Sequence, residues 1–388
     1  MAGAPNLAAR SMASLLDLDT PSALIDSRRM KANIDRMQQR MDALGVRFRP
    51  HVKTSKCVGV ANAQLAAGAA GITVSTLKEA EQFFAAGVTD VLYAVSIAPA
   101  KLSHVQALRQ SGCDLKIITD SVAGAEAIAH FGNAHAATFE VWIEVDVDGH
   151  RAGVDPCGDA LLAVARTLHE RGMRVGGVMA HAGSSYDCDR PDALRDIAEQ
   201  ERARSVLAAR RLRDAGLPCP VISVGSTPTA LSAQTLEGVT EVRAGVYVFF
   251  DLVMHNIGVC STDDIALSVL TTVIGHQEAK GWAMVDAGWM AMSRDRGTQK
   301  QRHDFGYGQV CTEEGAVVDG YIVETANQEH GIVCCADGVD DAIAARFPVG
   351  TRLRVLPNHA CATGAQFPEY HVILPSGDVE TWPRFHGW

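Results

Sequence analysis

The stretch Arg47-Phe-Arg-Pro-His-Val-Lys-Thr-Ser-Lys56 places a lysine directly after a predicted strand and just before a predicted helix. Val46 and Phe48 alternate as large apolar residues, which is typical of a strand, and the run from Lys56 to Ala67 has helical character. A lysine at the C-terminal end of a strand lies where α/β barrels carry their chemistry. Partial burial there favours the neutral amine of Lys53, which can then attack a carbonyl to form a Schiff base. The alternative is a solvated surface lysine, so the remaining sequence has to decide between the two.

A regular alternation of apolar, strand-like runs and amphipathic runs begins at this stretch. Eight strand-like runs with helices in most of the gaps are the number expected of a (β/α)8 barrel. Gly and Pro punctuate the connections between them. The sequence therefore predicts an α/β fold with a barrel as its main domain. The eight predicted strands cover residues 47–53, 71–76, 90–95, 114–120, 139–146, 174–181, 221–226 and 241–247.

Near residue 255 the alternation stops, and short strands separated by Gly, Asp and Pro follow. This pattern predicts a second, mostly β domain. The first residues are rich in Ala and Ser and weakly resemble a transit peptide, although an unstructured start is the simpler interpretation. The predicted parts are a flexible tail over 1–16 and a cofactor-binding barrel over 28–255. The third part is a β-rich domain made of residues 17–27 and 256–388, which carries the candidate metal ligands.

Composition excludes several classes of partner. The 388 residues carry a formal net charge of −10, and Lys and Arg are scattered, so no nucleic-acid-binding surface is expected. No apolar run approaches the length of a membrane span. The ten cysteines form no CxxC pair, which indicates thiols in a reducing compartment and hence a cytoplasmic protein.

Small and hydroxyl-bearing residues follow the seventh and eighth predicted strands. They are Gly225-Ser226-Thr227 and Gly245-Val246. Barrel enzymes often bind phosphate at these two places, because small residues let the backbone N–H groups approach the anion. Each motif alone could be an ordinary turn. Together with a Schiff-base lysine they indicate pyridoxal 5′-phosphate, a cofactor that needs both a lysine and a phosphate site.

Ten motifs carry a resemblance that spans about residues 17–365. The chain resembles the fold-type III enzymes of pyridoxal phosphate, the alanine racemase superfamily. Within it, the chain is similar to the branch of D-threonine aldolases, eukaryotic-type D-serine dehydratases and D-threo-3-hydroxyaspartate dehydratases, and most similar to the last group. RPHxKT followed by a late PNHxC is specific to this branch. The motifs are DLDTPSALID, RPHVKTSK, GITVSTLKEAEQFFAAG, DGHRAGV, HAGSS, VGSTPT, VRAGVYVFFD, VDAG, NQEHG and PNHACAT.

The resemblance implies roles for individual residues. Lys53 would form the Schiff base and act as the base. Arg151 would bind the phenolic oxygen of the cofactor, and His181 would lie against its ring. Arg243 matches the position that faces the pyridine nitrogen, which an arginine cannot protonate. The other implied cofactor-binding residues are Tyr186 and, around the phosphate, Gly225, Ser226, Thr227, Gly245 and Val246.

His359 and Cys361 stand two residues apart on a predicted extended segment, so both can reach one metal ion. Two protein ligands leave positions open for water or substrate, as a catalytic site requires. The resemblance makes this pair the divalent-metal site, although aldolases of the branch commonly have Asp where Cys361 stands. The softer thiolate favours Zn²⁺, Mn²⁺ or Co²⁺. Gln328, Glu329 and His330 are candidates for orienting the substrate or the metal-bound water, with a polar turn as the alternative.

The implied substrate is a D-amino acid with a 3-hydroxyl group, and the implied reaction removes water and then ammonia. D-threo-3-hydroxyaspartate would give oxaloacetate, and Arg294, Arg296 or Arg302 could bind its second carboxylate. The alternatives on the same scaffold are a retro-aldol cleavage to glycine and an aldehyde, and D-serine dehydration.

A racemase is less favoured, because no tyrosine-rich stretch precedes Val285-Asp286-Ala287-Gly288. A non-catalytic carrier of pyridoxal phosphate would resemble the barrel alone. The resemblance also implies a homodimer, with the active site at the subunit interface.

Overall fold

The computed structural model describes residues 11–12 and 14–388, and the chain divides into two compact units. The barrel unit contains residues 35–56, 60–245 and 387–388. The β unit contains the described residues up to 34, together with 57–59 and 246–386. Most of the predicted tail over 1–16 lies outside the described residues. Its described part forms β1 (Ser11–Met12), which pairs with β18 (Val379–Pro383), and the start of the 3₁₀ turn η1 (Leu15–Asp17).

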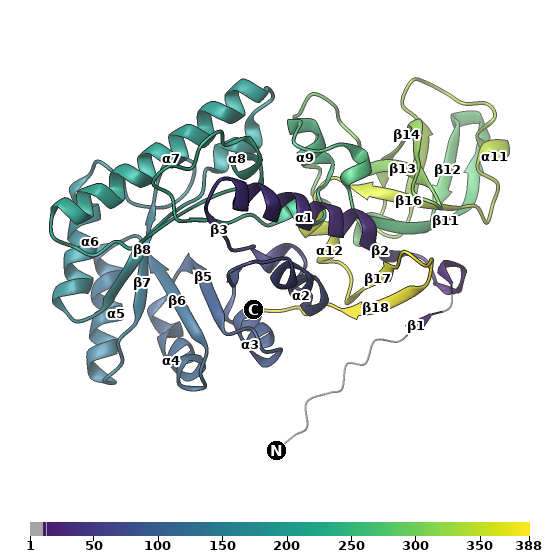
Figure 1. The fold of residues 1–388 in the computed structure, drawn as a ribbon. Helices are drawn as coiled ribbons and strands as arrows, with labels where there is room; N and C mark the ends of the chain where they lie inside the picture. Colours follow the sequence, from purple (N-terminus) through teal and green to yellow (C-terminus); the bar gives the residue numbers. More distant parts are fainter. Residues whose placement is uncertain (1–10, 13) are drawn as a thin grey trace, which may run out of the picture. The chain divides into compact units, whose positions relative to one another are not determined.

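The barrel unit is built on eight parallel strands in the order β3-β10-β9-β8-β7-β6-β5-β4 (Figure 1). A parallel bridge between His51 and Thr73 joins the two outer strands of this sheet. The predicted (β/α)8 barrel is thus confirmed. The strands are β3 (Arg47–Phe48), β4 (Ile72–Val74), β5 (Asp90–Ser96), β6 (Asp114–Thr119), β7 (Glu140–Val145), β8 (Arg174–Ala180), β9 (Val221–Val224) and β10 (Glu241–Val242).

The first barrel strand is shorter than the predicted 47–53. Pro50 has no N–H group to donate to a neighbouring strand. The chain then turns into η2 (Val52–Thr54), a single turn of 3₁₀ helix. The early end of the strand gives Lys53 a place in a turn at the rim of the barrel.

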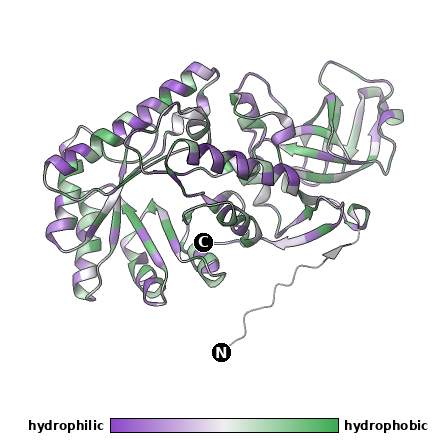
Figure 2. Cartoon of the chain, viewed as in Figure 1, coloured by the Kyte–Doolittle hydropathy of each residue, from purple (hydrophilic) through white to green (hydrophobic). Residues whose placement is uncertain are grey.

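Local sequence signals start the helices of the barrel unit. Thr76 accepts a hydrogen bond from the N–H of Glu79 at the start of α3, and Pro191 occupies the first turn of α7. Figure 2 shows hydrophobic and hydrophilic residues mixed along α7, as expected of a helix with one face on the sheet. The helices are α2 (Val58–Ala66), which begins in the β unit, α3 (Leu77–Ala85), α4 (Leu102–Gln110), α5 (Val122–Ala134), α6 (Asp159–Glu170), α7 (Pro191–Asp214) and α8 (Thr227–Ser232), with η3 (Pro99–Lys101) and η4 (Gly183–Asp187).

The β unit contains a ten-stranded sheet, as the strand pattern predicted. Strand β11 pairs with both β12 and β16, so six strands close on themselves into a small barrel. Strands β13 and β18 were missing from the sequence prediction, because such short segments are strands only through pairing with distant parts of the chain. The strands predicted for this domain covered residues 265–274, 281–286, 316–322, 331–335, 352–356 and 370–374. The elements are α1 (Ser27–Ala43, shared with the barrel unit), β2 (Ser22–Asp26), β11 (Leu267–Gln277), β12 (Trp282–Val285), β13 (Gly308–Thr312), β14 (Val317–Ala326), β15 (Gly331–Cys335), β16 (Arg352–Pro357), β17 (Glu369–Ile373), η5 (Val246–Val248), η6 (Thr262–Asp264), η7 (Glu278–Lys280), α9 (Leu252–Ile257), α10 (Trp289–Met292), α11 (Ile343–Arg346) and α12 (Ala360–Gly364).

Two findings bear on the predicted environment of the chain. None of the helices in the described ranges is long and apolar enough to cross a membrane. All ten cysteines lie within these ranges and form no disulfide.

Candidate active site

Lys53 lies in the turn η2 between two buried residues, Val52 and Thr54, each 1% exposed. Its own side chain is exposed to solvent, and its Nζ atom makes no hydrogen bond or ion pair with any residue in the described ranges. The partial burial expected from the sequence is therefore wrong for the chain by itself. The turn buries its two neighbours and leaves the amine of Lys53 accessible to a ligand.

His51, which was not among the predicted site residues, lies within electrostatic reach of four that were: Lys53, Arg151, His181 and Arg243. Burial, together with the positive charges of Lys53, Arg243 and Arg151, holds the pKa of His51 well below its ordinary value. Burial also lowers the pKa of His181 to about 3, although a hydrogen bond to a backbone carbonyl opposes the shift. Both rings are therefore neutral at neutral pH. The structure brings together residues that are far apart in the sequence.

The orientation of His181 is fixed by one hydrogen bond. Its Nδ1 atom donates to the carbonyl oxygen of Gly225 at 2.9 Å, since a carbonyl can only accept. The neutral ring consequently carries its proton on Nδ1. The ring of Tyr186 lies 6.0 Å away, centroid to centroid, at an interplanar angle of 44°. The hydrogen bond thus fixes the plane of the His181 ring beside Tyr186.

Arg151 is held by a glutamate from the barrel interior. Its Nη2 atom donates to Oε1 of Glu144 at 3.1 Å, and the Glu144 side chain is only 6% exposed. Burial raises the pKa of Glu144, while Arg151 opposes this shift. The guanidinium of Arg151 is itself half exposed, so its other donors remain open to a ligand.

The loop after β9 is buried, and most of its polar groups form hydrogen bonds within the protein. The Ser226 hydroxyl accepts from the N–H of Thr229 and lies 2.8 Å from the Ser185 hydroxyl, so that it caps α8. The N–H of Ser226 donates to the Thr229 hydroxyl at 3.0 Å. In the chain alone these groups shape the loop. The buried Thr227 follows them at the start of α8.

Gly245 lies after β10 and closely approaches the Lys53 segment. A Cβ atom at this position would lie 3.0 Å from the carbonyl oxygen of His51 and 3.1 Å from Oγ1 of Thr54. Glycine therefore allows the two segments to approach each other. Val246, the next residue, belongs to the β unit.

The cluster around Lys53 contains polar atoms that lack a hydrogen-bond partner in the protein, and these atoms show whether a cofactor fits there. Within the described ranges, Nζ of Lys53 and Nη1 of Arg243 have no hydrogen-bond partner, and Nδ1 of His51 is buried without one. Buried polar groups are normally satisfied. A polar, planar cofactor with an aldehyde for Lys53 and ring atoms that accept hydrogen bonds fits these residues.

Glu201 is a buried carboxylate beside the predicted site that the sequence reasoning missed. It lies on α7, is 1% exposed, and its Oε1 atom accepts from the N–H of Ala182 at 2.9 Å and of Gly225 at 3.0 Å. It thereby ties together the loops that carry His181 and the predicted phosphate site. A signal was present, because Glu201 is the charged residue among the buried positions of α7, which otherwise hold Leu, Ala and Ser residues.

Replacing Glu201 by Ala should destabilise the barrel unit. Two buried N–H groups would lose their acceptor, at a cost of about 1–3 kcal/mol each. Urea unfolding of the purified protein measures this change. Glu201→Gln keeps one acceptor oxygen and should cost less, and Glu199→Ala on the exposed face of the same helix should be nearly neutral. Equal stability of Glu201→Ala and Glu199→Ala would contradict this role.

The β unit brings a carboxylate to the predicted metal pair, one that the sequence reasoning also missed. His359 precedes α12, and its Nδ1 atom lies 2.6 Å from Oδ2 of Asp295. Burial alone would lower the pKa of His359, but hydrogen bonds to Asp295 and Cys361 raise it to about 11. The fully buried Asp251 accepts from the N–H of Ala360 at 2.9 Å and so anchors the turn between the two predicted ligands.

The chemistry of this group fits a divalent metal ion with open positions. No cluster of three metal-ligating side chains occurs among the described residues, so the predicted pair would supply two protein ligands. An imidazole and a thiolate are suitable first ligands for Zn²⁺, Mn²⁺ or Co²⁺. Asp295 would fix the imidazole through Nδ1 and leave Nε2 for the ion, an arrangement common at metal-binding histidines.

The other predicted polar residues of the β unit lie in an exposed turn. Gln328, Glu329 and His330 connect β14 and β15, and Nε2 of Gln328 donates to Glu329 at 3.2 Å. None of the three forms a hydrogen bond with His359. Of the candidate arginines, Arg296 is paired with Asp304, whereas the Arg294 guanidinium lies over the Trp289 ring at 4.6 Å.

Comparisons with known proteins agree with this geometry. Residues 25–253 match the family model "Alanine racemase, N-terminal domain", and residues 266–373 match "Putative serine dehydratase domain". The D-threo-3-hydroxyaspartate dehydratase of Delftia sp. strain HT23 is 68% identical over 97% of this chain and 99% of its own length. Its solved structure has a TM-score of 0.96 and covers 97% of this chain and 100% of the other. The D-serine dehydratase of Dictyostelium discoideum is 29% identical, over 92% of this chain and 94% of its own.

Two further structural comparisons concern the metal pair and the aldolases. Solved structures of D-threo-3-hydroxyaspartate dehydratase include a variant with a histidine replaced by alanine and a metal-free variant with the cysteine two positions later replaced. D-threonine aldolase from Filomicrobium marinum is 25% identical, with a TM-score of 0.83 over 96% of this chain and 97% of the other. The chain therefore belongs to the alanine racemase family of pyridoxal-phosphate enzymes, in the branch that joins its barrel to a serine dehydratase-type β domain.

Proposed function

We propose that the chain is a pyridoxal-phosphate- and divalent-metal-dependent lyase that converts D-threo-3-hydroxyaspartate to oxaloacetate and ammonia. The proposal is supported most strongly by the 68% identity to the Delftia dehydratase over nearly the whole of both chains. The His-x-Cys pair at His359 and Cys361 supports it further, because variants of that enzyme replace a histidine and a cysteine with the same spacing.

The barrel residues supply cofactor binding and proton transfer in this proposal. Bound pyridoxal phosphate would withdraw electrons from Cα of the substrate and so make its proton acidic. Lys53 would hold the cofactor through its aldehyde group, and its amine would serve as the base that accepts the Cα proton. Arg151 would donate to the phenolic oxygen, and the neutral His181 would lie against the ring. Tyr186 would line the cofactor site, and the residues that would hold the phosphate are Gly225, Ser226, Thr227, Gly245 and Val246.

The β unit supplies the metal in this proposal. His359 and Cys361 would hold the ion, whose Lewis acidity helps the 3-hydroxyl group leave as hydroxide. Asp295 fixes the ring of His359, and Asp251 fixes the backbone between the two ligands. Arg294, which forms no ion pair with the described residues and lies over the Trp289 ring, is the best candidate for the second carboxylate of the substrate. Gln328, Glu329 and His330 are candidates for its orientation. The assembly is a cytoplasmic homodimer, a location supported by ten cysteines without a disulfide.

A product assay with three substrates in parallel tests this function. Purified, metal-loaded enzyme receives D-threo-3-hydroxyaspartate, D-serine and D-threonine. Oxaloacetate and ammonia should form fastest from the first, stop after EDTA treatment, and return when a divalent metal is added. Pyruvate from D-serine as the fastest product would favour a D-serine dehydratase. Glycine and an aldehyde from D-threonine, without ammonia from any substrate, would show an aldolase instead.

A further inference from the structure

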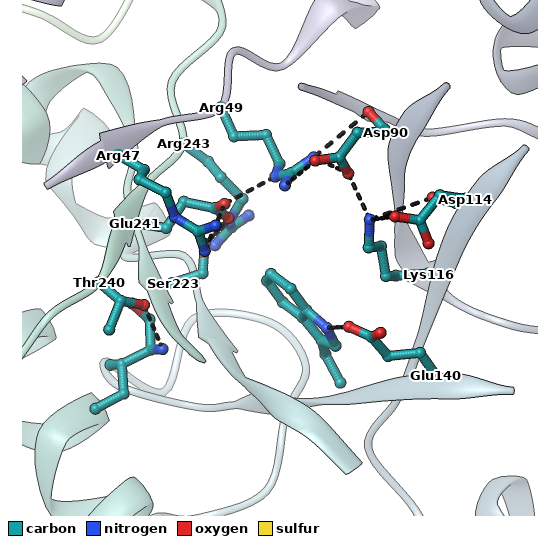
Figure 3. Close-up of polar contacts among 12 residues, drawn as sticks. Arg47, Arg49, Asp90, Asp114, Lys116, Glu140, Ser223, Thr240, Glu241 and Arg243 are labelled. Carbon is teal, nitrogen blue, oxygen red and sulfur yellow. Dashed lines mark hydrogen bonds and ion pairs between the residues drawn. The ribbon is translucent and has the colours of Figure 1, made fainter. Parts of the chain in front are cut away.

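An alternating series of charges crosses the interior of the barrel unit (Figure 3). Lys116 binds Asp114 at 2.6 Å and Asp90 at 2.5 Å. Asp90 in turn receives two hydrogen bonds from the guanidinium of Arg49, at 2.8 and 3.0 Å. The Nε atom of Arg49 donates to Oε2 of Glu241 at 2.9 Å. Positive and negative groups therefore alternate from the solvent-exposed Asp114 to a fully buried Glu241.

The series continues through a serine to Arg243. Ser223 lies beside Glu241 in the register of β9 and β10, and its hydroxyl is 2.9 Å from Oε1 of Glu241. The same hydroxyl is 2.9 Å from Nε of Arg243. An arginine Nε–H can only donate, so the Ser223 oxygen accepts from Arg243 and its single proton goes to Glu241. The direction of each hydrogen bond is thus fixed by chemistry.

Arg243 ends the series with one nitrogen unused. Its Nε atom donates to Ser223 and its Nη2 atom to the carbonyl oxygen of Ala180, whereas Nη1 has no hydrogen-bond partner among the described residues. The side chain is 4% exposed, so two protein contacts hold the guanidinium in one orientation. The remaining nitrogen is therefore aimed by the protein before any ligand arrives.

Stability alone does not explain this network. Buried ion pairs are costly to desolvate, and well-packed apolar residues often stabilise a core as well or better. The same interior contains a hydrophobic cluster formed by Leu92, Ile118, Trp142 and Met179. Apolar side chains therefore fill neighbouring positions of this core, and they could have replaced the charged ones. The charges that remain converge on a residue of the predicted cofactor site.

We infer that Ser223 and Glu241 are positioning residues that set the orientation of Arg243 toward the cofactor ring, with Arg49 and Asp90 holding Glu241 in place. This inference rests on the proposed cofactor placement and goes beyond it, because neither residue would touch cofactor or substrate. The carboxylate of Glu241, acting through one serine hydroxyl, keeps the guanidinium a fixed hydrogen-bond donor to the ring nitrogen. A movable guanidinium would bind this nitrogen less well and alter how strongly the ring withdraws electrons.

Ser223→Ala tests the inference with little change in volume. The holoenzyme variant should keep its fold and cofactor, while the pH midpoint of its visible Schiff-base band shifts by about half a unit or more. Its kcat should fall about 10- to 100-fold, because a misaimed group distant from the chemistry costs that much. KM should stay within about twofold, since Arg243 binds cofactor and not substrate. Ser223→Thr keeps the hydroxyl, so the pH midpoint of its Schiff-base band should return to the wild-type value.

Ser205→Ala is the matched control. Ser205 is a fully buried serine on α7 whose hydroxyl has no partner in the described ranges, so its loss should change neither the band nor kcat. A Ser223→Ala band and pH midpoint identical to wild type would overturn the inference, as would a fall in kcat explained fully by a smaller folded fraction. A wild-type chain with no visible band after addition of pyridoxal phosphate would instead refute the proposed cofactor site. The band is read without substrate, so a failure of the dehydratase assay leaves this test intact.

Discussion

Lys53→Ala should abolish turnover of D-threo-3-hydroxyaspartate and remove the visible Schiff-base band of the holoenzyme. Loss of the base alone is expected to cost about 10²–10⁴-fold in rate. Loss of the amine that binds the cofactor adds to this cost, because the cofactor must then be held by non-covalent contacts alone. The side chain is exposed and unpaired in the chain alone, so the substitution should leave stability almost unchanged.

Borohydride reduction followed by peptide mass analysis locates the attachment directly. The wild-type enzyme should yield a pyridoxyl adduct on a peptide that contains Lys53, and Lys53→Ala should yield none. Lys56→Ala is the matched control, since Lys56 lies three residues later in the same segment and pairs with Glu79 at 3.3 Å. An adduct that survives in Lys53→Ala, or that disappears in Lys56→Ala, would assign the cofactor to another lysine.

The second large effect is expected at the metal pair. His359→Ala and Cys361→Ala should each lose the bound metal and most dehydratase activity, while the visible band of the cofactor remains. Lewis-acid assistance contributes several kcal/mol, so the rate should fall by about 10²–10⁴-fold. Metal content by elemental analysis and the cofactor spectrum are measured on the same samples, which separates loss of metal from loss of fold.

Two further variants sharpen this test. Asp295→Asn keeps the size of the side chain that holds Nδ1 of His359, and it should weaken metal binding by about 10- to 100-fold in a calorimetric titration. Cys335→Ala replaces a partly exposed cysteine of the same unit and should change neither metal content nor rate. Full metal content in Cys361→Ala would refute the assignment of this pair.

Much of the fold could be predicted because its signals are local. The alternation of apolar strands and amphipathic helices located all eight barrel strands, and residues such as Thr76 and Pro191 mark where helices begin. Strand ends were less well predicted. Pro50 ends β3 early, and β18 exists only because β17 and β1 pair with it. Pairing between distant segments leaves little trace in a short polar sequence.

Residue type and spacing were enough to predict the reactive groups proposed for this protein: a lysine after the first barrel strand and a His-x-Cys pair, within motifs of the alanine racemase family. Their chemistry depends on residue type and spacing, which a sequence displays directly. The residues that we propose to orient these groups became recognisable only from contacts in the folded chain. Glu201, Asp295 and the series from Asp114 to Arg243 act across separate strands and helices. Their partners are distant in the chain, and a buried carboxylate is recognisable as functional only when the groups that it binds are known.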